Sequence, residues 1–379
     1  MIIFCLLLLS SVALLWVVAR LLWGLQRFKF RPAFTPNDAE LPTVSVCIPA
    51  RNEMHALAQC LEYVLSSDYE KLEILVLDDS SKDDTSLIIR SFAHAGVRFV
   101  PGKALPEGWL GKNHAYKTLA EEASGDYLLF MDVDTLVQPK TISQLVGQLL
   151  AAKVSMLSVL PRREDTARMS AIFGSMRYLW DILLAFRETP PATSALWMIK
   201  RENLLALDKG LDSYAASVRP EMHIARYLQK SKQYYYLIAS HSLGVRYEKR
   251  WKSQVASSER MYYPMFGHTI PGTLFAVSML SLLWLPFAVS GYLLAQNDSL
   301  AWFALALCLG LYVWFSAFSL TVYRGGWTVF RIIVLPYLLL QEITLLIWST
   351  VRHLTGTVTW KDRKVHAQPL HPAHYSIDE

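Results

Sequence analysis

Two aspartates stand two positions apart in "MDVDT" (131–135), at the end of the apolar run 127–132. In an extended chain, residues two apart point to the same side, so Asp132 and Asp134 are predicted to face one ion together. Carboxylate oxygens suit a hard divalent cation such as Mg²⁺ or Mn²⁺, which phosphate oxygens also bind. The motif therefore predicts a metal site that holds a diphosphate; a solvated acidic turn is the alternative interpretation.

Polar side chains also follow two earlier apolar runs, in "IPARNE" (48–53) and "VLDDSS" (76–81). Carboxylates here can accept hydrogen bonds from a base or ribose, while helix capping explains some of these residues equally well. The predicted nucleotide contacts are Pro49, Arg51, Glu53, Asp78 and Asp79.

The stretch "LPEGWLGKNHA" (105–115) combines glycines with a large aromatic residue and a lone cation. Gly108 and Gly111 allow the backbone to approach a ligand closely. Lys112 is predicted to begin a helix and to meet a diphosphate, where its charge adds to that of the helix N-terminus. Trp109 offers a flat wall for a sugar or an acceptor. The alternative is a tryptophan in the core and a solvated lysine.

These residues need a scaffold that brings them together, and the alternation of apolar patterns supplies one. Four short runs predict buried strands and three stretches show helical spacing. The predicted strands are 43–49, 72–79, 97–100 and 127–132, and the predicted helices are 53–65, 83–95 and 112–123. Strand–helix repetition predicts an α/β domain over residues 41–245 with a mostly parallel sheet. Ligands bind such sheets outside the carboxyl ends of the strands.

Both ends of the 379-residue chain are strongly apolar. Residues 2–19 carry no charge, and basic residues follow them, which predicts an uncleaved anchor over 1–24 with the next domain in the cytoplasm. The C-terminal third predicts transmembrane helices over 267–351 and a basic tail over 352–379. Within it, 332–350 is interrupted by Pro336 and Glu342, so a re-entrant or interfacial segment is an alternative there.

The net charge is +5, and the basic residues gather beside the apolar segments. We therefore expect them to face anionic lipid and not nucleic acid. The four cysteines show no CxxC spacing, so the sequence predicts neither a zinc site nor a disulfide framework. Together these features predict a multi-pass protein of the cell (inner) membrane.

Three motifs in order, "VSVCIPARNE", "ILVLDDSSKDDT" and "YLLFMDVDT", resemble family-2 glycosyltransferases, which have the nucleotide-sugar-binding GT-A fold. The "LPEGWLGKNHA" stretch resembles a membrane-anchored subset that glycosylates lipids, including carotenoid (hydroxychlorobactene-type) glycosyltransferases and, more distantly, ceramide glucosyltransferases. The element "TWKDR" (359–363) is similar to the C-terminal motif of that subset, with Asp362 in place of glycine. The resemblance implies that Asp79, with Asp78, contacts the nucleoside and that Asp134 is the main metal ligand.

The resemblance also implies a catalytic base, which in the family is the second acid of a Glu-Asp pair. In "VRPEMHIARYL" (218–228) this place is taken by Glu221, with Pro220 at the preceding position. A sugar acceptor needs a positioned carboxylate or imidazole to take its proton. Asp212 and His223 are the alternatives, and a purely structural role at the helix start is another.

Two segments are candidates for contact with an apolar acceptor. Residues 170–186 are rich in aromatic side chains, which indicates either a core helix or a groove. Residues 246–266 mix basic and aromatic residues and predict a helix in the membrane interface. Processive relatives carry an Arg-Trp motif here, so Arg250, Trp251 and Arg260 are predicted acceptor contacts, in addition to Trp109 of the 105–115 stretch.

Together these observations predict an inverting glycosyltransferase. It would move a hexose from a nucleotide sugar, a UDP-sugar in our prediction, to a hydroxyl or carboxyl of a membrane lipid such as a carotenoid. A processive polysaccharide synthase is one alternative, although the chain is short for it. A non-catalytic membrane transporter or scaffold is the other, although the strand-end acids are intact.

Overall fold

The computed structural model describes residues 1–31, 41–186, 189–207, 210–360 and 363–364. The predicted sheet is present and has the strand order β3-β2-β1-β4-β8-β6-β9. Its strands are β1 (Val44–Ala50), β2 (Leu72–Asp78), β3 (Val97–Pro101), β4 (Tyr127–Met131), β6 (Met156–Leu160), β8 (Leu196–Lys200) and β9 (Tyr234–Ile238). Every neighbouring pair is parallel except those of β8, which runs antiparallel to β4 and β6. The sheet is therefore mostly parallel, as predicted.

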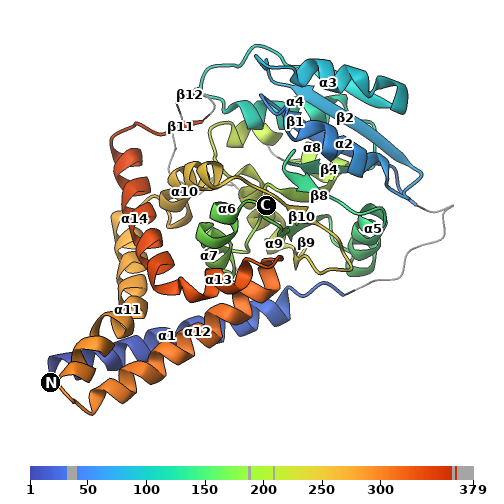
Figure 1. Cartoon of the computed structure of the whole chain (residues 1–379). Helices are drawn as coiled ribbons and strands as arrows, with labels where there is room; N and C mark the ends of the chain where they lie inside the picture. The colour runs from blue at the N-terminus through green and yellow to red at the C-terminus, as the bar shows by residue number, and fades with distance from the viewer. Residues whose placement is uncertain (32–40, 187–188, 208–209, 361–362, 365–379) are drawn as a thin grey trace, which may run out of the picture.

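Side chains of the central strands alternate between two cores on opposite faces of the sheet. In β1, Val46 and Ile48 pack with the first core, whereas Cys47 packs with the second. The first core includes α2 (Leu57–Leu65), α3 (Thr85–Ser91) and α5 (Thr141–Ala152). The second includes α4 (Gly111–Glu122) and α9 (Pro220–Lys230). Helices thus cover both faces of the sheet (Figure 1).

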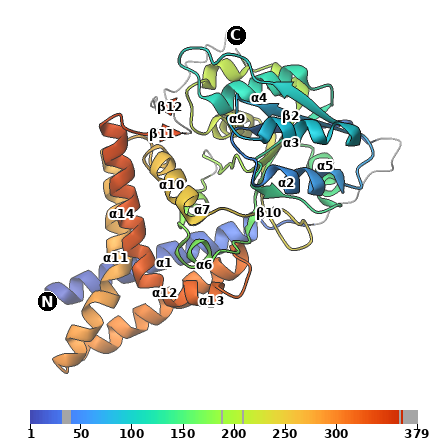
Figure 2. The same cartoon turned by 45° about the horizontal axis from the view of Figure 1, so that its top comes forward.

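The second core continues into the apolar helices. These are α1 (Ile2–Arg27), α11 (Ile270–Ala295), α12 (Leu300–Val322), α13 (Thr328–Ile333) and α14 (Leu335–Leu354). Both views show α1 beside α12, extending away from the sheet domain to the N-terminus (Figures 1 and 2). In the described part of the chain, α1, α11 and α12 are long and apolar enough to cross a membrane.

Three helices join the sheet domain to this apolar group: the short α6 (Arg168–Phe173) and α7 (Arg177–Leu183), and the longer α10 (Trp251–Met265). Two of them, α6 and α7, replace the single helix expected over 170–186. The helical conformation is interrupted at Gly174, where an added Cβ would lie 2.6 Å from the Gln254 side chain and 2.6 Å from a backbone carbonyl. Most of α7 is buried, so it belongs to the core.

The remaining elements are small. They comprise α8 (Arg201–Leu205), the 3₁₀ turns Ala93–Ala95 and Gly210–Tyr214, and five short strands: β5 (Thr135–Leu136), β7 (Arg162–Arg163), β10 (Arg246–Tyr247), β11 (Thr359–Trp360) and β12 (Arg363–Lys364). The strands β5, β10 and β7 form a second sheet. Most of the predicted basic tail, 365–379, lies outside the described residues, as does Asp362.

Candidate active site

A cavity of about 170 Å³ lies at the carboxyl ends of β1, β2 and β4, where the sequence predicts a ligand. Many of the predicted site residues line it: Pro49, Arg51, Glu53, Asp79, Lys112, Asp132, Asp134, Glu221 and Arg260. Asp78, Trp109, Arg250 and Trp251 are not among its lining residues. One wall therefore comes from the sheet edge and α4, and the opposite wall from α7, α9 and α10.

The first wall carries an ion pair between two predicted nucleotide contacts. Arg51 donates a hydrogen bond from Nη1 to the backbone carbonyl of Asp79 at 2.6 Å, and the Asp79 carboxylate lies 3.5 Å away. Asp78 instead holds the turn after β2, because its carboxylate accepts hydrogen bonds from the Ser81 backbone N–H, at 3.0 Å, and from the Ser86 hydroxyl. Of the two predicted aspartates, only Asp79 reaches the cavity.

The carboxylates of the MDVDT motif have different partners. Asp132 pairs with Lys112 at 2.5 Å. The ligand atoms of Asp134, Glu53 and His55 lie within 4.8 Å of one another. Burial raises the pKa of Asp134; Lys249 opposes this shift, and repulsion from Glu53 and Asp132 adds to it. A divalent cation would relieve that repulsion, and the two carboxylates of this cluster are the kind of ligand that Mn²⁺ or Mg²⁺ prefers.

Lys112 occupies the second position of α4, as predicted. Burial alone would lower the pKa of its ammonium group, but the adjacent Asp132 carboxylate outweighs burial and the pKa is raised. The lysine is therefore a permanent cation beside the first turn of a helix. Such a position favours a bound anion.

Glu221 lies in the first turn of α9, behind Pro220, and is fully buried. Neither carboxylate oxygen accepts a hydrogen bond from the described residues, and Arg219 Nε is 3.8 Å away. Burial raises the pKa of Glu221, and Arg219 and Lys112 offset only part of that shift. The alternative bases lie elsewhere: Asp212 pairs with Lys117 at 2.7 Å, and His223 stacks on Tyr214.

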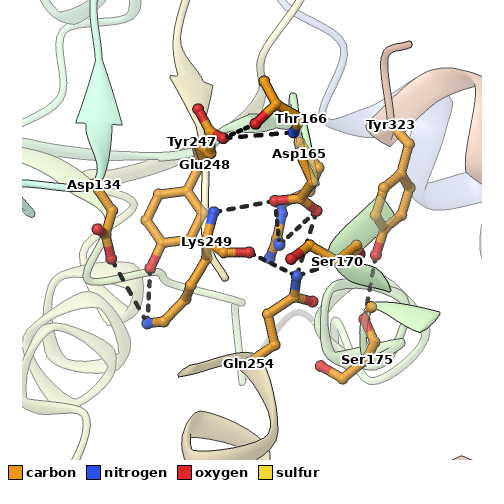
Figure 3. A network of polar contacts seen from close by, with 12 residues as sticks. Asp134, Asp165, Thr166, Ser170, Ser175, Tyr247, Glu248, Lys249, Gln254 and Tyr323 are labelled. Carbon is orange, nitrogen blue, oxygen red and sulfur yellow. Dashed lines mark hydrogen bonds and ion pairs between the residues drawn. The ribbon is translucent and has the colours of Figure 1, made fainter. Parts of the chain in front are cut away.

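Several cavity residues were not predicted from the sequence, among them Lys249 and Tyr247. The pairing of β10 with β5 brings Tyr247 opposite Thr135, the residue that follows Asp134. The Lys249 ammonium lies 3.9 Å from Asp134 and donates to the Tyr247 hydroxyl at 3.2 Å (Figure 3). Burial lowers the pKa of Lys249 to about 8, against the attraction of Asp134. No periodicity or motif in the sequence links these distant positions.

The opposite wall adds further unpredicted residues. Arg219 pairs with Asp181 at 2.9 Å, and both line the cavity with Arg177. Arg260 lies over the ring of Trp360, 5.2 Å from its centroid, and Trp360 also lines the cavity. The sequence singled out the element containing Trp360 but gave this residue no role.

The other predicted acceptor residues lie outside the lining. Trp109 contacts His114 and lies under the ammonium of Lys117. Arg250 is exposed at the start of α10, and Trp251 is partly buried beside it. Their role in acceptor binding stays a prediction.

Comparison with known proteins identifies the type of domain that carries this site. The family model described as "Glycosyl transferase family 2" matches residues 45–204. The probable glycosyltransferase YdaM of Bacillus subtilis (strain 168) is 32% identical over 149 residues, which cover 36% of this chain and 35% of YdaM. An N-acetylglucosaminyltransferase of Bradyrhizobium elkanii is 30% identical over 148 residues, covering 37% of this chain and 80% of that protein.

A third relative is the 4,4'-diaponeurosporenoate glycosyltransferase of Staphylococcus haemolyticus (strain JCSC1435), 31% identical over 139 residues that cover 35% of this chain and 36% of the relative. With YdaM and this relative, the match spans only about a third of the relative's length. Among solved structures, the mannosyltransferase PcManGT of Pyrobaculum calidifontis, in complex with GDP-Man and Mn²⁺, aligns with a TM-score of 0.55. The alignment has 19% identity and covers 93% of this chain and 98% of that one. The predicted GT-A fold is confirmed.

Proposed function

This chain belongs to glycosyl transferase family 2, and on that basis we propose that it transfers a hexose from a nucleotide sugar to a hydroxyl or carboxyl of a membrane lipid. Its class is that of an enzyme, a family 2 glycosyltransferase that uses nucleotide sugars. The observation that supports a lipid as the acceptor is the position of the cavity. One wall belongs to the sheet edge and the other to α7 and α10, which pack against the apolar helices α1 and α14.

The donor would bind along the first wall. Arg51 and Asp79 would contact the nucleoside, and Lys112 would hold the diphosphate together with the first turn of α4. Asp134, with Glu53 and His55, and with Asp132 nearby, would hold a divalent cation. When bound, such a cation neutralises charge on the diphosphate leaving group. The complex of PcManGT with GDP-Man and Mn²⁺ supports this assignment by analogy of fold.

The acceptor would enter from the side of α7 and α10. Glu221 would take the proton of an acceptor hydroxyl as its oxygen attacks the anomeric carbon. The new bond from this carbon to the acceptor oxygen forms as the bond to the diphosphate breaks, and the nucleoside diphosphate departs. A single displacement inverts the anomeric configuration. An acceptor carboxylate, as in the substrate named for the Staphylococcus haemolyticus relative, would attack without losing a proton.

The test is to incubate membranes containing the full chain with a panel of radiolabelled nucleotide sugars and to analyse the extracted lipid. We expect one sugar to label a lipid, and Asp134→Ala to abolish labelling. With a hydroxyl acceptor, Glu221→Gln should lower kcat by about 100- to 10,000-fold, the usual contribution of a general base. Asp212→Asn, outside the cavity, is the matched control and should retain activity.

Three outcomes would contradict the proposal. Labelled polymer in place of lipid would indicate a processive synthase. If no nucleotide sugar labelled a lipid, the proposed transfer to a membrane lipid would be refuted. If Glu221→Gln kept substantial activity on a hydroxyl acceptor, Glu221 could not be the base.

A further inference from the structure

Three cations gather on the wall of the cavity that adjoins the apolar helices. Arg177 comes from α7, Arg260 from α10, and Lys249 from the segment just before α10. The helix α7 packs against α1, and α10 packs against α14. Arg177 and Arg260 therefore lie on helices that adjoin the apolar group, the side from which a lipid would arrive.

The cavity lining holds as many carboxylates as cations, but among the described residues none of these carboxylates forms an ion pair with Arg177 or Arg260. Asp132 is paired with Lys112, and Asp181 with Arg219. Asp134 is 3.9 Å from Lys249 and belongs to the cluster that a divalent cation would occupy. Two guanidinium groups, those of Arg177 and Arg260, thus remain without a carboxylate partner among the described residues.

The contacts of the two arginines confirm this. Within the described chain, Arg177 forms no hydrogen bond or ion pair, and its guanidinium lies 5.4 Å from the ring centroid of Tyr178. Arg260 donates a long hydrogen bond of 3.4 Å to the Ser257 hydroxyl and lies over Trp360. Burial lowers the pKa of Arg260 to about 10, and repulsion from Arg177 adds to that shift.

Partly buried cations of like sign are costly unless an anion joins them, and the planar guanidinium group binds phosphate and carboxylate through paired hydrogen bonds. We propose that Arg177 and Arg260, with Lys249, form a subsite for an anionic oxygen group of the acceptor lipid; this inference rests on the proposed function. The acceptor is then an anionic amphiphile, bearing a phosphate or a carboxylate beside or at its reacting oxygen, and not a neutral lipid.

The shared chemistry has a second source, the diphosphate of the donor, and the experiment separates the two. The full chain is placed in nanodiscs of neutral phospholipid, and binding is measured by calorimetry. The donor arm titrates UDP and GDP with Mn²⁺; the acceptor arm titrates decyl phosphate, decanoate and neutral decanol in the presence of the nucleotide that binds.

We expect Arg177→Met and Arg260→Met each to weaken decyl phosphate or decanoate binding about tenfold or more, as loss of a charge-assisted contact should. Nucleotide affinity should change less than twofold, and decanol binding should not depend on either arginine. Arg177→Lys and Arg260→Lys, which keep the charge, should restore part of the affinity and show that folding is intact. Lys252→Met, on the exposed face of α10, is the matched control and should leave every affinity unchanged.

The proposal is overturned if nucleotide affinity falls as much as decyl phosphate affinity, because the arginines then serve the donor. It is also overturned if the anionic probes bind no better than decanol, or if the methionine variants bind them normally. Failure of the wild-type protein to bind either nucleotide with Mn²⁺ would instead refute the proposed function itself.

Discussion

Glu221 combines burial with carboxylate oxygens that accept no hydrogen bond from the described residues. Arg219 and Lys112 keep the carboxylate form accessible, while burial makes it more basic. A base with a raised pKa takes a proton more readily, provided that it stays ionised at the working pH. The residue therefore has an environment suited to deprotonating an acceptor hydroxyl.

This environment predicts the pH dependence of the reaction. Since only the ionised form of Glu221 accepts a proton, kcat/KM on a hydroxyl acceptor should fall as the pH drops through its pKa. Because burial raises this pKa above 4.5, the acid limb should lie above pH 4.5. The measurement is initial rate at low acceptor concentration across pH 4 to 9. A limb at or below pH 4.5 would contradict the role of Glu221.

The same raised pKa of Glu221 predicts that the stability of the fold decreases with rising pH, whereas activity increases. A carboxyl whose pKa is raised on folding holds its proton more tightly in the folded state, so stability falls as pH rises from 4.5 through the folded pKa. Glu221→Gln removes this loss. Relative to wild type, we expect the melting temperature of the variant to be higher at pH 8 than at pH 4. A difference that is independent of pH would mean that Glu221 does not titrate in this range.

The residues that the sequence predicted are those that follow a strand or begin a helix. Asp79 and Asp134 follow strands β2 and β4, and Lys112 lies in the first turn of α4. The parallel sheet alone therefore brings these residues to one edge. Lys249 and Asp181 lacked such a signal. They reach the cavity through two-residue strands and a short helix, whose placement depends on tertiary pairing rather than on local periodicity.

Among the elements, the small sheet of β5, β10 and β7 determines where Lys249 lies. Asp165, just after β7, accepts hydrogen bonds from two sides. Its carboxylate binds Arg163 at 2.7 and 2.8 Å and the backbone N–H of Lys249 at 3.0 Å, with Gln254 of α10 nearby (Figure 3). The carboxylate thus joins β7 to the segment between β10 and α10.

Asp165→Ala should be strongly destabilising, because it leaves the buried Arg163 without its partner. Breaking a buried pair in this way costs about 3–5 kcal/mol. The control is Glu202→Ala, which removes the exposed pair of Glu202 with Lys200 and should cost less than about 1 kcal/mol. Denaturant unfolding of the detergent-purified protein measures both. Equal, small losses would show that Asp165 does not hold the small sheet in place.

Helical periodicity predicted the long elements well and the short ones poorly. The sequence placed an interruption at Pro336, but proline is tolerated in the first turn of a helix, and here it stands in the first turn of α14. Glu342 is also accommodated: it is fully buried and accepts hydrogen bonds from the Met176 N–H, at 2.8 Å, and from the Tyr262 hydroxyl. Both partners lie on the sheet-domain side, where no sequence pattern could reveal them.

Taken as a whole, the molecule has one continuous core that joins the sheet domain to the apolar helices. A single cluster of buried residues includes Cys47 of β1, Trp180 of α7 and Leu338 of α14. The apolar helices therefore contribute to the packing of the cavity wall as well as to any membrane anchor. This arrangement also bears on the side of the membrane at which the C-terminal segment lies.

Counting four spans would put the C-terminal segment on the opposite side from the sheet domain, yet Trp360 lines the same cavity as residues of the sheet edge. The conflict disappears if the three candidate spans, α1, α11 and α12, are the segments that cross the membrane. The chain would then return to the side of the sheet domain before α14 begins. Arg352 would then lie on the same side as the sheet domain, which the positive-inside rule predicts to be the cytoplasmic side.

We therefore predict the accessibility of single cysteines introduced into a Cys5→Ser background, in which the remaining native cysteines are buried. Asn297→Cys, between α11 and α12, should react with a membrane-impermeant maleimide in right-side-out vesicles. Thr359→Cys should react only in inside-out vesicles, as should Lys153→Cys in the sheet domain, which serves as the internal reference. If Thr359→Cys reacted together with Asn297→Cys, α14 would have to cross the membrane, and Trp360 could not line the cavity.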